Sequence, residues 1–465
     1  MTARMSAIAA LATLVGCATL PPPNPPISTV IVPERFVFAS DQSGERAEIA
    51  ALLPVNDPAF VALYKAALAD GPTLAAAIAR IDAARAQADR TRAEQRPSLR
   101  ADAGVTASRT SVAQTALPPG IDIERDRVTF GANVTARWDF DVFGELRAQR
   151  QAALARLDAT TADAAAVRLA LIAEVAVATI DWRTLAARRE TLEEDLNAAR
   201  ALHALARVRA RAGLAPGADQ VRADGLVADA EARLAPLVGQ RAQIVGQLTL
   251  LTGRPAADVL AMLGAEQTTS GSRAAVASAP SALLAQRPDI AAAAARLRAA
   301  DADLAAAAAQ RFPRLTLTAG IGLLGLAIGD LFDDNALLGS LGAGIAGPLL
   351  DFGRVQAEID QRNAVAREAF ALYRRAVFQA LADSESAFGL VSASDTQALR
   401  LARQAAVELD AVHLVAVRYR TGLSDFAPVV EARRAANATR IARATAEGEQ
   451  ARARVLLWQA LGGGL

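Results

Sequence analysis

One set of short motifs occurs twice in this chain, at a constant spacing of 209 residues, the distance from Gly213 to Gly422. The matched positions are Phe143, Gly144, Arg209, Arg211, Gly213, Leu214 and Gly253 in the first half and Phe352, Gly353, Arg418, Arg420, Gly422, Leu423 and Gly462 in the second. Solenoid repeats are only about 20 to 50 residues long. The sequence therefore predicts two copies of one large block, 57–254 and 285–465, joined by a linker at 255–284.

Each block contains two segments in which apolar and polar residues alternate. The predicted strands lie near 98–109 and 126–140 in the first block and near 314–326 and 338–350 in the second. Alternation gives a strand one apolar and one polar face, and about 9 to 11 residues allow a tilted strand to cross a bilayer. An alternative is a hairpin of membrane helices at 315–329 and 335–350, but both stretches fall short of the usual ~18 residues and are rich in glycine. We therefore favour membrane strands.

A long stretch without proline follows each strand pair, at Glu145–Arg211 and at Arg354–Arg420. Apolar residues recur there in steps of three and four, which predicts a coiled-coil-like seam, and the dispersed charges exclude burial in lipid. Each stretch stops just before a glycine, Gly213 or Gly422, the residue that best tolerates a left-handed helix end. The other predicted helices are 58–94 and 217–252 in the first block and 288–310 and 425–461 in the second.

Four membrane strands cannot form a closed wall by themselves. An open sheet edge in lipid leaves backbone N–H and C=O groups without partners, so the chain must oligomerise. Two copies would give eight strands, a barrel that side chains fill, whereas three would give twelve and could enclose water. The residues alone leave both numbers open.

Composition excludes several classes of function. The chain has 50 basic and 49 acidic residues, so it lacks the basic excess that is typical of a nucleic-acid-binding protein. Aromatic residues are only 4%, and alanine is abundant in the predicted helices, which suits thin, closely packed helices. No phosphate-binding GxxxxGK[ST] loop is present, and the two histidines, His203 and His413, stand alone on long helices. We therefore expect no enzyme, no metal and no nucleic-acid partner.

The N-terminus resembles an export signal. An apolar run at Met5–Val15 follows Arg4 and is too short to span a bilayer. It leads into Gly16 and Cys17, the single cysteine of the chain, which resembles the lipobox of bacterial lipoproteins. We therefore expect a signal peptide at 1–16, a covalent lipid such as palmitate on Cys17 as the only attached group, and an N-terminal tether and belt segment at 17–56, which is Pro-rich from Pro21 to Pro26.

Motifs at four places in the second block also occur, in the same order, in a known family. They are Gln286, Arg287, Pro288, Asp289 and Ile290; the strand entry at Pro313; the turn Leu350, Asp351, Phe352, Gly353 and Arg354; and the helix tip Tyr419, Arg420, Thr421, Gly422 and Leu423. On these motifs the chain resembles the outer-membrane factor family, the TolC-like and NodT-type lipoproteins of tripartite efflux systems.

The resemblance implies a fold and a set of partners. The fold would be an α+β membrane protein, a homotrimer with a twelve-stranded outer-membrane β-barrel, four strands from each protomer, continuous with a long periplasmic α-helical barrel. The partners would be a periplasmic adaptor (membrane fusion protein) and an inner-membrane pump of the resistance-nodulation-division (RND) type. The protein would be lipid-anchored in the outer membrane and would conduct drugs, toxic organic molecules or metal ions passively to the exterior.

The resemblance also implies a periplasmic gate at the helix tips, beside the turns at Gly213 and Gly422. Relatives have a network of Tyr, Arg and Asp there, and acidic residues that face the lumen. The matching candidates in this chain are Tyr419, Arg420, Asp425, Glu431 and Asp219. A ring of carboxylates would attract cations in a narrow pore.

Two other functions remain open at this stage. A type I secretion exit duct would share the channel architecture. A lipid-anchored periplasmic coiled-coil scaffold would also need long Ala-rich helices, but it would not need four amphipathic strands.

Overall fold

The computed structural model describes residues 36–38, 49–111, 125–264 and 286–463. They form two compact units. The strand unit is drawn from 82–159 and 294–372, and the helical unit from the described residues of 30–81, 160–293 and 373–465. Cys17 lies outside the described residues, as does most of the predicted tether.

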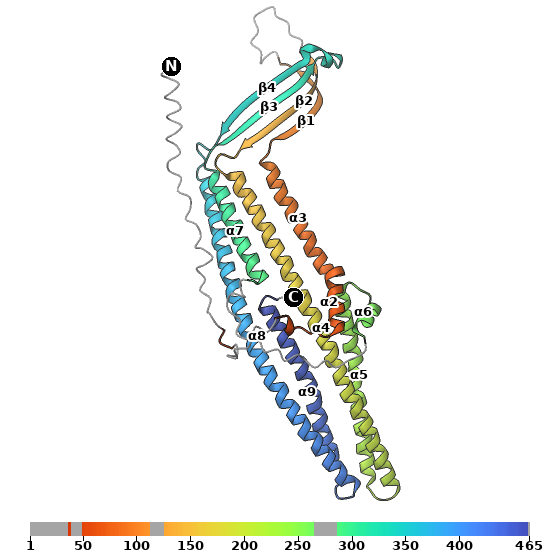
Figure 1. Ribbon diagram of the computed structural model, residues 1–465. Helices are drawn as coiled ribbons and strands as arrows, with labels where there is room; N and C mark the ends of the chain where they lie inside the picture. Colours follow the sequence, from red (N-terminus) through yellow and green to blue (C-terminus); the bar gives the residue numbers. More distant parts are fainter. Residues whose placement is uncertain (1–35, 39–48, 112–124, 265–285, 464–465) are drawn as a thin grey trace, which may run out of the picture. The chain divides into compact units, whose positions relative to one another are not determined.

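A single four-stranded sheet dominates the strand unit (Figure 1). Its strands are β1 (Ser98–Arg109), β2 (Asp126–Phe140), β3 (Arg314–Gly325) and β4 (Leu337–Ala346), antiparallel and in chain order. One face carries exposed apolar side chains such as Leu99, Val105 and Leu341, which are 76%, 63% and 78% exposed. The outer edges of β1 and β4 have no strand partner among the described residues.

The polar face of the sheet combines side chains from β1 and β2 with glycines from β3. Asp102, Asn133 and Gly322 share one register row, and the Asn133 Nδ2 donates to Asp102 Oδ2 at 3.4 Å. A Cβ at position 322 would lie 2.1 Å from Asn133 Oδ1. The same Cβ would lie 2.8 Å from the backbone carbonyl oxygen of Ala132, which cannot move aside as a side chain can, so glycine is favoured at this position of β3.

β4 is shorter than the predicted strand 338–350, because it ends at Ala346. A Cβ on Gly347 would lie 2.8 Å from the Cα of Pro313, and the next residue, Pro348, has no N–H to continue the ladder. Close approach to the entry of β3 thus ends the strand. Two short 3-10 helices, η6 (Gly329–Phe332) and η7 (Asp334–Ala336), connect β3 to β4.

Two helices of 67 residues each, α4 (Glu145–Arg211) and α8 (Arg354–Arg420), leave the sheet. An aspartate that lies just before each helix accepts backbone N–H groups at the helix start. Asp141 accepts from Leu146 and Arg147 at 3.0 and 2.8 Å, and Asp351 accepts from Gly353 and Val355 at 3.1 and 3.0 Å. Such carboxylates satisfy the free N–H groups of a helix start.

Both long helices end in the same way. Gly213 and Gly422 have positive φ angles of 70° and 79°. The amides of the residues that follow them, Leu214 and Leu423, each donate to a helical carbonyl at 2.8 Å. This left-handed closure strongly favours glycine. None of the helices in the described ranges is both long and apolar enough to cross a membrane.

The predicted helix 58–94 is wrong, because the structure has two helices there. They are α2 (Pro58–Asp70) and α3 (Pro72–Glu94). Gly71 between them is extended, and a Cβ there would lie 2.2 Å from the carbonyl oxygen of Ala67. Pro72 then starts the new helix, in the position where its missing N–H has no cost.

The remaining helices complete the two units. They are η3 (Ile49–Leu52), α5 (Gly217–Thr252), α6 (Ala256–Leu263), α7 (Pro288–Ala309) and α9 (Ala427–Ala460). The region predicted as a linker, 255–284, contains α6, and 265–285 lies outside the described residues. Packing is close: a Cβ on Gly448 of α9 would lie 2.3 Å from Thr184 Oγ1 of α4.

Candidate functional site

A cluster of buried apolar side chains lies near the glycine turns of the helical unit, where α4, α5, α8 and α9 contribute to one core. This tip cluster consists of Ala199, Leu202, Ala206, Ala223, Leu226, Tyr419, Phe426, Val429 and Val430. Tyr419 is 2% exposed and Phe426 is fully buried, with ring centroids 5.2 Å apart. Both helix pairs are therefore joined at this end by side-chain packing.

Arg209 of α4 contacts Tyr419 in the tip cluster. Its Nη1 donates to the backbone carbonyl of Tyr419 at 2.6 Å, and its Cζ lies 4.6 Å from the centre of the Tyr419 ring. The contact combines a charge-assisted hydrogen bond with a cation–π interaction. Burial raises the pKa of the Tyr419 phenol, so this ring is neutral at physiological pH.

The Tyr419 hydroxyl is buried and has no hydrogen-bond partner among the described residues. A polar atom in this condition costs about 1 to 3 kcal/mol relative to a satisfied one. The tip cluster thus contains one unsatisfied polar group next to the Arg209 contact.

The other predicted gate residues differ in how far they are buried. Asp219 is 6% exposed, and its carboxylate lies 3.5 Å from Arg222 Nη1. Arg420, Asp425 and Glu431 are exposed on the surface of the helical unit. The structure therefore brings Asp219 and Tyr419 into one electrostatic environment and leaves the other three exposed in the protomer.

Arg209 is the member of this site that the gate prediction missed. It belongs to the repeated motif, where it matches Arg418, but Arg418 is exposed and Arg209 is half-buried. The sequence feature that points to Arg209 is the repeat, and the repeat does not distinguish Arg209 from Arg418.

Neither histidine belongs to a cluster of metal ligands among the described residues. His203 Nε2 lies 2.8 Å from Asp224 Oδ1, and His413 is exposed. No group of three or more potential metal ligands occurs in the part of the chain that the structure describes.

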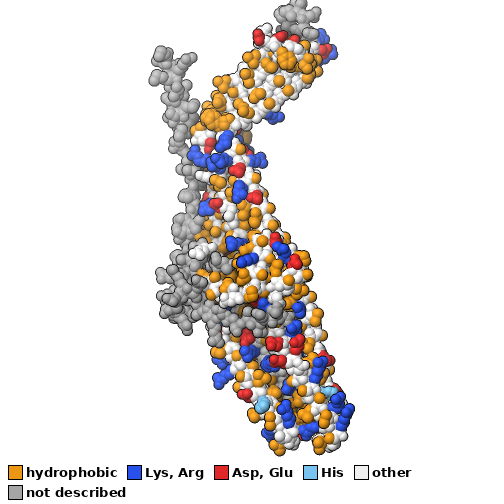
Figure 2. Space-filling model, turned by 45° about the vertical axis from the view of Figure 1, so that its right-hand side comes forward, with side chains coloured by type: hydrophobic (Ala, Val, Ile, Leu, Met, Phe, Trp, Pro, Cys, Tyr) orange, Lys and Arg blue, Asp and Glu red, His pale blue; other side chains and the backbone are white. Residues whose placement is uncertain are grey.

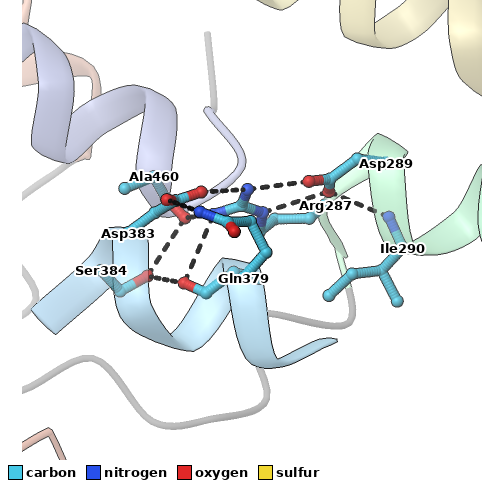
Figure 3. A network of polar contacts seen from close by, with 8 residues as sticks. Arg287, Asp289, Ile290, Gln379, Asp383, Ser384 and Ala460 are labelled. Carbon is cyan, nitrogen blue, oxygen red and sulfur yellow. Dashed lines mark hydrogen bonds and ion pairs between the residues drawn. The ribbon is translucent and has the colours of Figure 1, made fainter. Parts of the chain in front are cut away.

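A second polar centre surrounds Arg287, at the start of α7 (Figure 3). The guanidinium donates to both carboxylate oxygens of Asp289 at 3.1 and 2.8 Å, to Asp383 of α8 at 3.1 Å, and to the carbonyl of Ala460 in α9 at 2.8 Å. Burial alone would lower the pKa of Arg287, but the bonds to Asp289 and Asp383 outweigh it and raise this pKa. Arg287 thus joins three helices, and the Arg-Pro-Asp motif has a structural role here.

A third polar centre joins α2, α4 and α6. Arg183 donates to Asp57 through Nε at 2.8 Å and Nη2 at 3.0 Å, and Nη2 reaches the Leu263 carbonyl at 3.4 Å. The side chains of Arg183 and Asp57 are only 8% and 2% exposed. Asp57 also caps α2, because it accepts the Ala59 amide at 2.9 Å.

The four amphipathic strands and the two pairs of long helices define a class of membrane channel. The family described as outer membrane efflux protein matches residues 63–254 and 279–463, and the chain belongs to this family. The resemblance to TolC-like and NodT-type proteins is confirmed.

Two relatives and one solved structure illustrate the match. The pyoverdine export outer membrane protein OpmQ of Pseudomonas aeruginosa is 31% identical, over 99% of this chain and 96% of its own. The toluene efflux pump outer membrane protein TtgI of Pseudomonas putida is 29% identical, over 98% and 97%. The outer-membrane channel OprN has a TM-score of 0.85 and 26% identity, over 96% and 99% of the two chains.

These findings confirm the predicted class of function. The chain is an outer-membrane exit channel of an efflux system, with a periplasmic helical part, and it is not an enzyme. The scaffold alternative is excluded.

Proposed function

We propose that three copies of this chain form a twelve-stranded barrel in the outer membrane, continuous with a periplasmic barrel of helices. The observation that carries this proposal is the sheet itself, with four strands, two outer edges without strand partners and an exposed apolar face. Closure removes unpaired edges that lipid would not tolerate. Three copies give a barrel wide enough for water, whereas the eight strands of a dimer would be filled by side chains.

The substrates proposed for this channel are small molecules, delivered by an inner-membrane RND-type pump through a periplasmic adaptor. Relatives named for the export of pyoverdine and of toluene support this class. A type I secretion duct is the second candidate, but none of the relatives described above is named for protein secretion. Transport through the channel would be passive, with the pump as the source of energy.

A test of the assembly is to purify the protein in mild detergent and to measure its mass and its conductance. We expect an oligomer of three 48.2-kDa chains, less any cleaved signal, that resists detergent, dissociates on heating and conducts ions in planar bilayers. A monomer that fails to conduct would overturn the channel, and a conducting dimer would overturn the trimer.

We also propose that Cys17 carries a lipid anchor, on the basis of the lipobox resemblance. Mass spectrometry of the mature N-terminus checks it: acyl chains on Cys17 are expected, and an unmodified Cys17 would contradict the anchor.

For the gate, we propose that the exposed carboxylates of Glu431 and Asp425 line the narrow end of the pore. Tyr419 and Asp219 would belong to the contacts that hold it closed within the protomer, and the exposed Arg420 to contacts between protomers. Glu431 and Asp425 are exposed in the protomer, as residues facing a water-filled lumen must be. Three copies of each carboxylate would attract cations by Coulomb interaction.

Glu431→Gln should therefore reduce the preference of the channel for cations, by about twofold or more in the reversal-potential permeability ratio. The measurement is the reversal potential in a salt gradient across a planar bilayer. Glu447→Gln, on the same helix, is the matched control, because Glu447 is bound to Arg443 at 2.9 Å. Unchanged selectivity in Glu431→Gln would remove Glu431 from the pore.

A further inference from the structure

Four aromatic side chains gather where the sheet meets the helices of the strand unit, in a chain with only 4% aromatic residues. The ring centroids of Trp138 and Phe140 are 3.8 Å apart. Those of Phe143 and Phe312 are 4.6 Å apart, with ring planes 9° from parallel. We call these four residues the junction aromatic cluster.

The junction aromatic cluster is not a buried core. Phe140 and Phe143 are 36% and 41% exposed, and the neighbouring Val142 is 64% exposed. Trp138 and Phe140 continue the apolar face of β2, two and four residues beyond Ala136. Aromatic side chains at the end of an apolar membrane face are typical of the boundary between acyl chains and headgroups.

Gln95 holds three elements together beside this cluster. Its backbone carbonyl accepts from Trp138 Nε1 at 3.1 Å, and its Nε2 donates to the carbonyl of Leu146 at 3.1 Å. Its Oε1 accepts from Arg150 at 3.4 Å. Because Trp138 is on the apolar face of the sheet, Gln95 places the end of α3 and the start of α4 at the edge of that face.

Two arginines stand next to this centre and have no acidic partner among the described residues. Arg96 follows Gln95, and Arg147 follows Leu146; both are exposed. The nearby acids are engaged otherwise: Asp141 accepts the first amides of α4, and Glu94 pairs with Arg90 at 3.2 Å.

Other arginines at the junction are held by partners. Arg314 binds Glu145 with Nη2 at 2.5 Å from Oε1, and Arg311 donates to Gln356 at 2.6 Å. Figure 2 shows basic side chains gathered directly beneath the apolar surface of the strands, on the face that it displays. The junction therefore combines partly exposed aromatic rings with the guanidinium groups of Arg96 and Arg147, which have no acidic partner in the part of the chain that the structure describes.

We propose that Arg96 and Arg147 bind the phosphate of an anionic phospholipid in the periplasmic leaflet of the outer membrane, whose acyl chains lie against Phe140 and Phe143. This inference rests on the proposed barrel, because it needs the apolar face of the sheet to be in lipid. Guanidinium groups match phosphate oxygens in geometry and charge. An acidic peptide would also suit the arginines, but continuity with the apolar face favours a lipid.

The experiment uses the full-length protein in detergent, exchanged into dioleoylphosphatidylglycerol or dioleoylphosphatidylcholine. Native mass spectrometry then counts the phospholipids that the oligomer retains. We expect retained phosphatidylglycerol, and a loss of about fivefold in apparent affinity for each arginine removed in Arg96→Gln/Arg147→Gln. Arg207→Gln/Arg211→Gln is the matched control, with two exposed arginines at the helix tip, and should retain phosphatidylglycerol as the wild type does.

A second readout locates the lipid. Of the three tryptophans, Trp182 and Trp458 are 2% and 1% exposed in the helical unit, so brominated phosphatidylglycerol should quench mainly Trp138 fluorescence. The difference between the wild type and Trp138→Phe isolates this signal, which should fall in the Arg96/Arg147 variant.

Equal phosphatidylglycerol retention in the Arg96/Arg147 variant and in the control would overturn the lipid site. So would binding of a polyglutamate peptide in place of lipid. If the variant still forms conducting oligomers in that case, the lipid site alone has failed; if the wild type itself neither oligomerises nor conducts, the barrel has failed.

Discussion

Asp57→Ala is expected to destabilise the helical unit by about 4 kcal/mol. The substitution removes the carboxylate that faces a guanidinium only 8% exposed, and it also removes the cap of α2. Breaking a buried ion pair from one side is costly because the remaining charge stays out of water without that counter-charge. The melting temperature of the detergent-solubilised protein, measured by the circular dichroism of its helices, should fall by several degrees.

Two controls separate the buried pair from a general loss of charge. Asp158→Ala removes an exposed pair with Arg298, whose side chains are 62% and 58% exposed, and should cost less than about 1 kcal/mol. Asp57→Asn/Arg183→Met removes both charges and should recover much of the loss. A melting temperature for Asp57→Ala equal to that of Asp158→Ala would show that the pair is unimportant.

The pH dependence of this effect has a definite sign. Burial alone would raise the pKa of Asp57, but hydrogen bonds from Arg183 and from the Ala59 amide outweigh it and lower this pKa below the usual 3.8. A carboxyl with a lowered folded-state pKa contributes its full stability above pH 3.8 and loses it as the pH falls through the folded value. The difference in melting temperature between wild type and Asp57→Ala should therefore be constant near neutral pH and shrink below pH 3.8.

Arg209→Ala should open the channel. The substitution removes a hydrogen bond to the Tyr419 carbonyl and the contact with its ring, together worth about 2 kcal/mol. That energy corresponds to a shift of roughly 30-fold in the ratio of closed to open states. The measurement is the open probability and mean conductance of single channels in planar bilayers.

Arg207→Ala is the matched control for this prediction, because Arg207 is exposed and two residues away on the same helix. Tyr419→Phe should behave as the wild type or close more tightly, since the hydroxyl has no partner among the described residues. If Arg209→Ala forms intact oligomers with wild-type conductance, then contacts other than the one between Arg209 and Tyr419 keep the tip closed.

Much of the element order could be read from local patterns. α4 and α8 cover the two long stretches that lack proline, and both end beside the glycines of the repeated motif. The two errors have different causes. Gly71 and Pro72 are a local break in a stretch that is otherwise helical in composition, whereas β4 ends where Gly347 meets Pro313 at the entry of the neighbouring strand β3.

The candidate gate was predicted less completely than the fold. A motif places Tyr419 beside a turn, but burial of Tyr419 and Asp219 and exposure of Glu431 depend on which faces of four helices meet. Arg209 and Arg418 are equivalent in the repeat, and only the packing of α4 against Tyr419 gives one of them a partner.

The sequence by itself determined the strands, the long helices and their turns, because alternation, the absence of proline and the placement of glycine act over a few residues. It also determined the family, through motifs in order. Tertiary structure alone decided that Arg183 meets Asp57, that Arg287 reaches Asp383 and the Ala460 carbonyl, and that Gln95 joins Trp138 to the start of α4. Those partners are far apart in the chain, and a buried charge or amide gives no local sign of the distant group that will satisfy it.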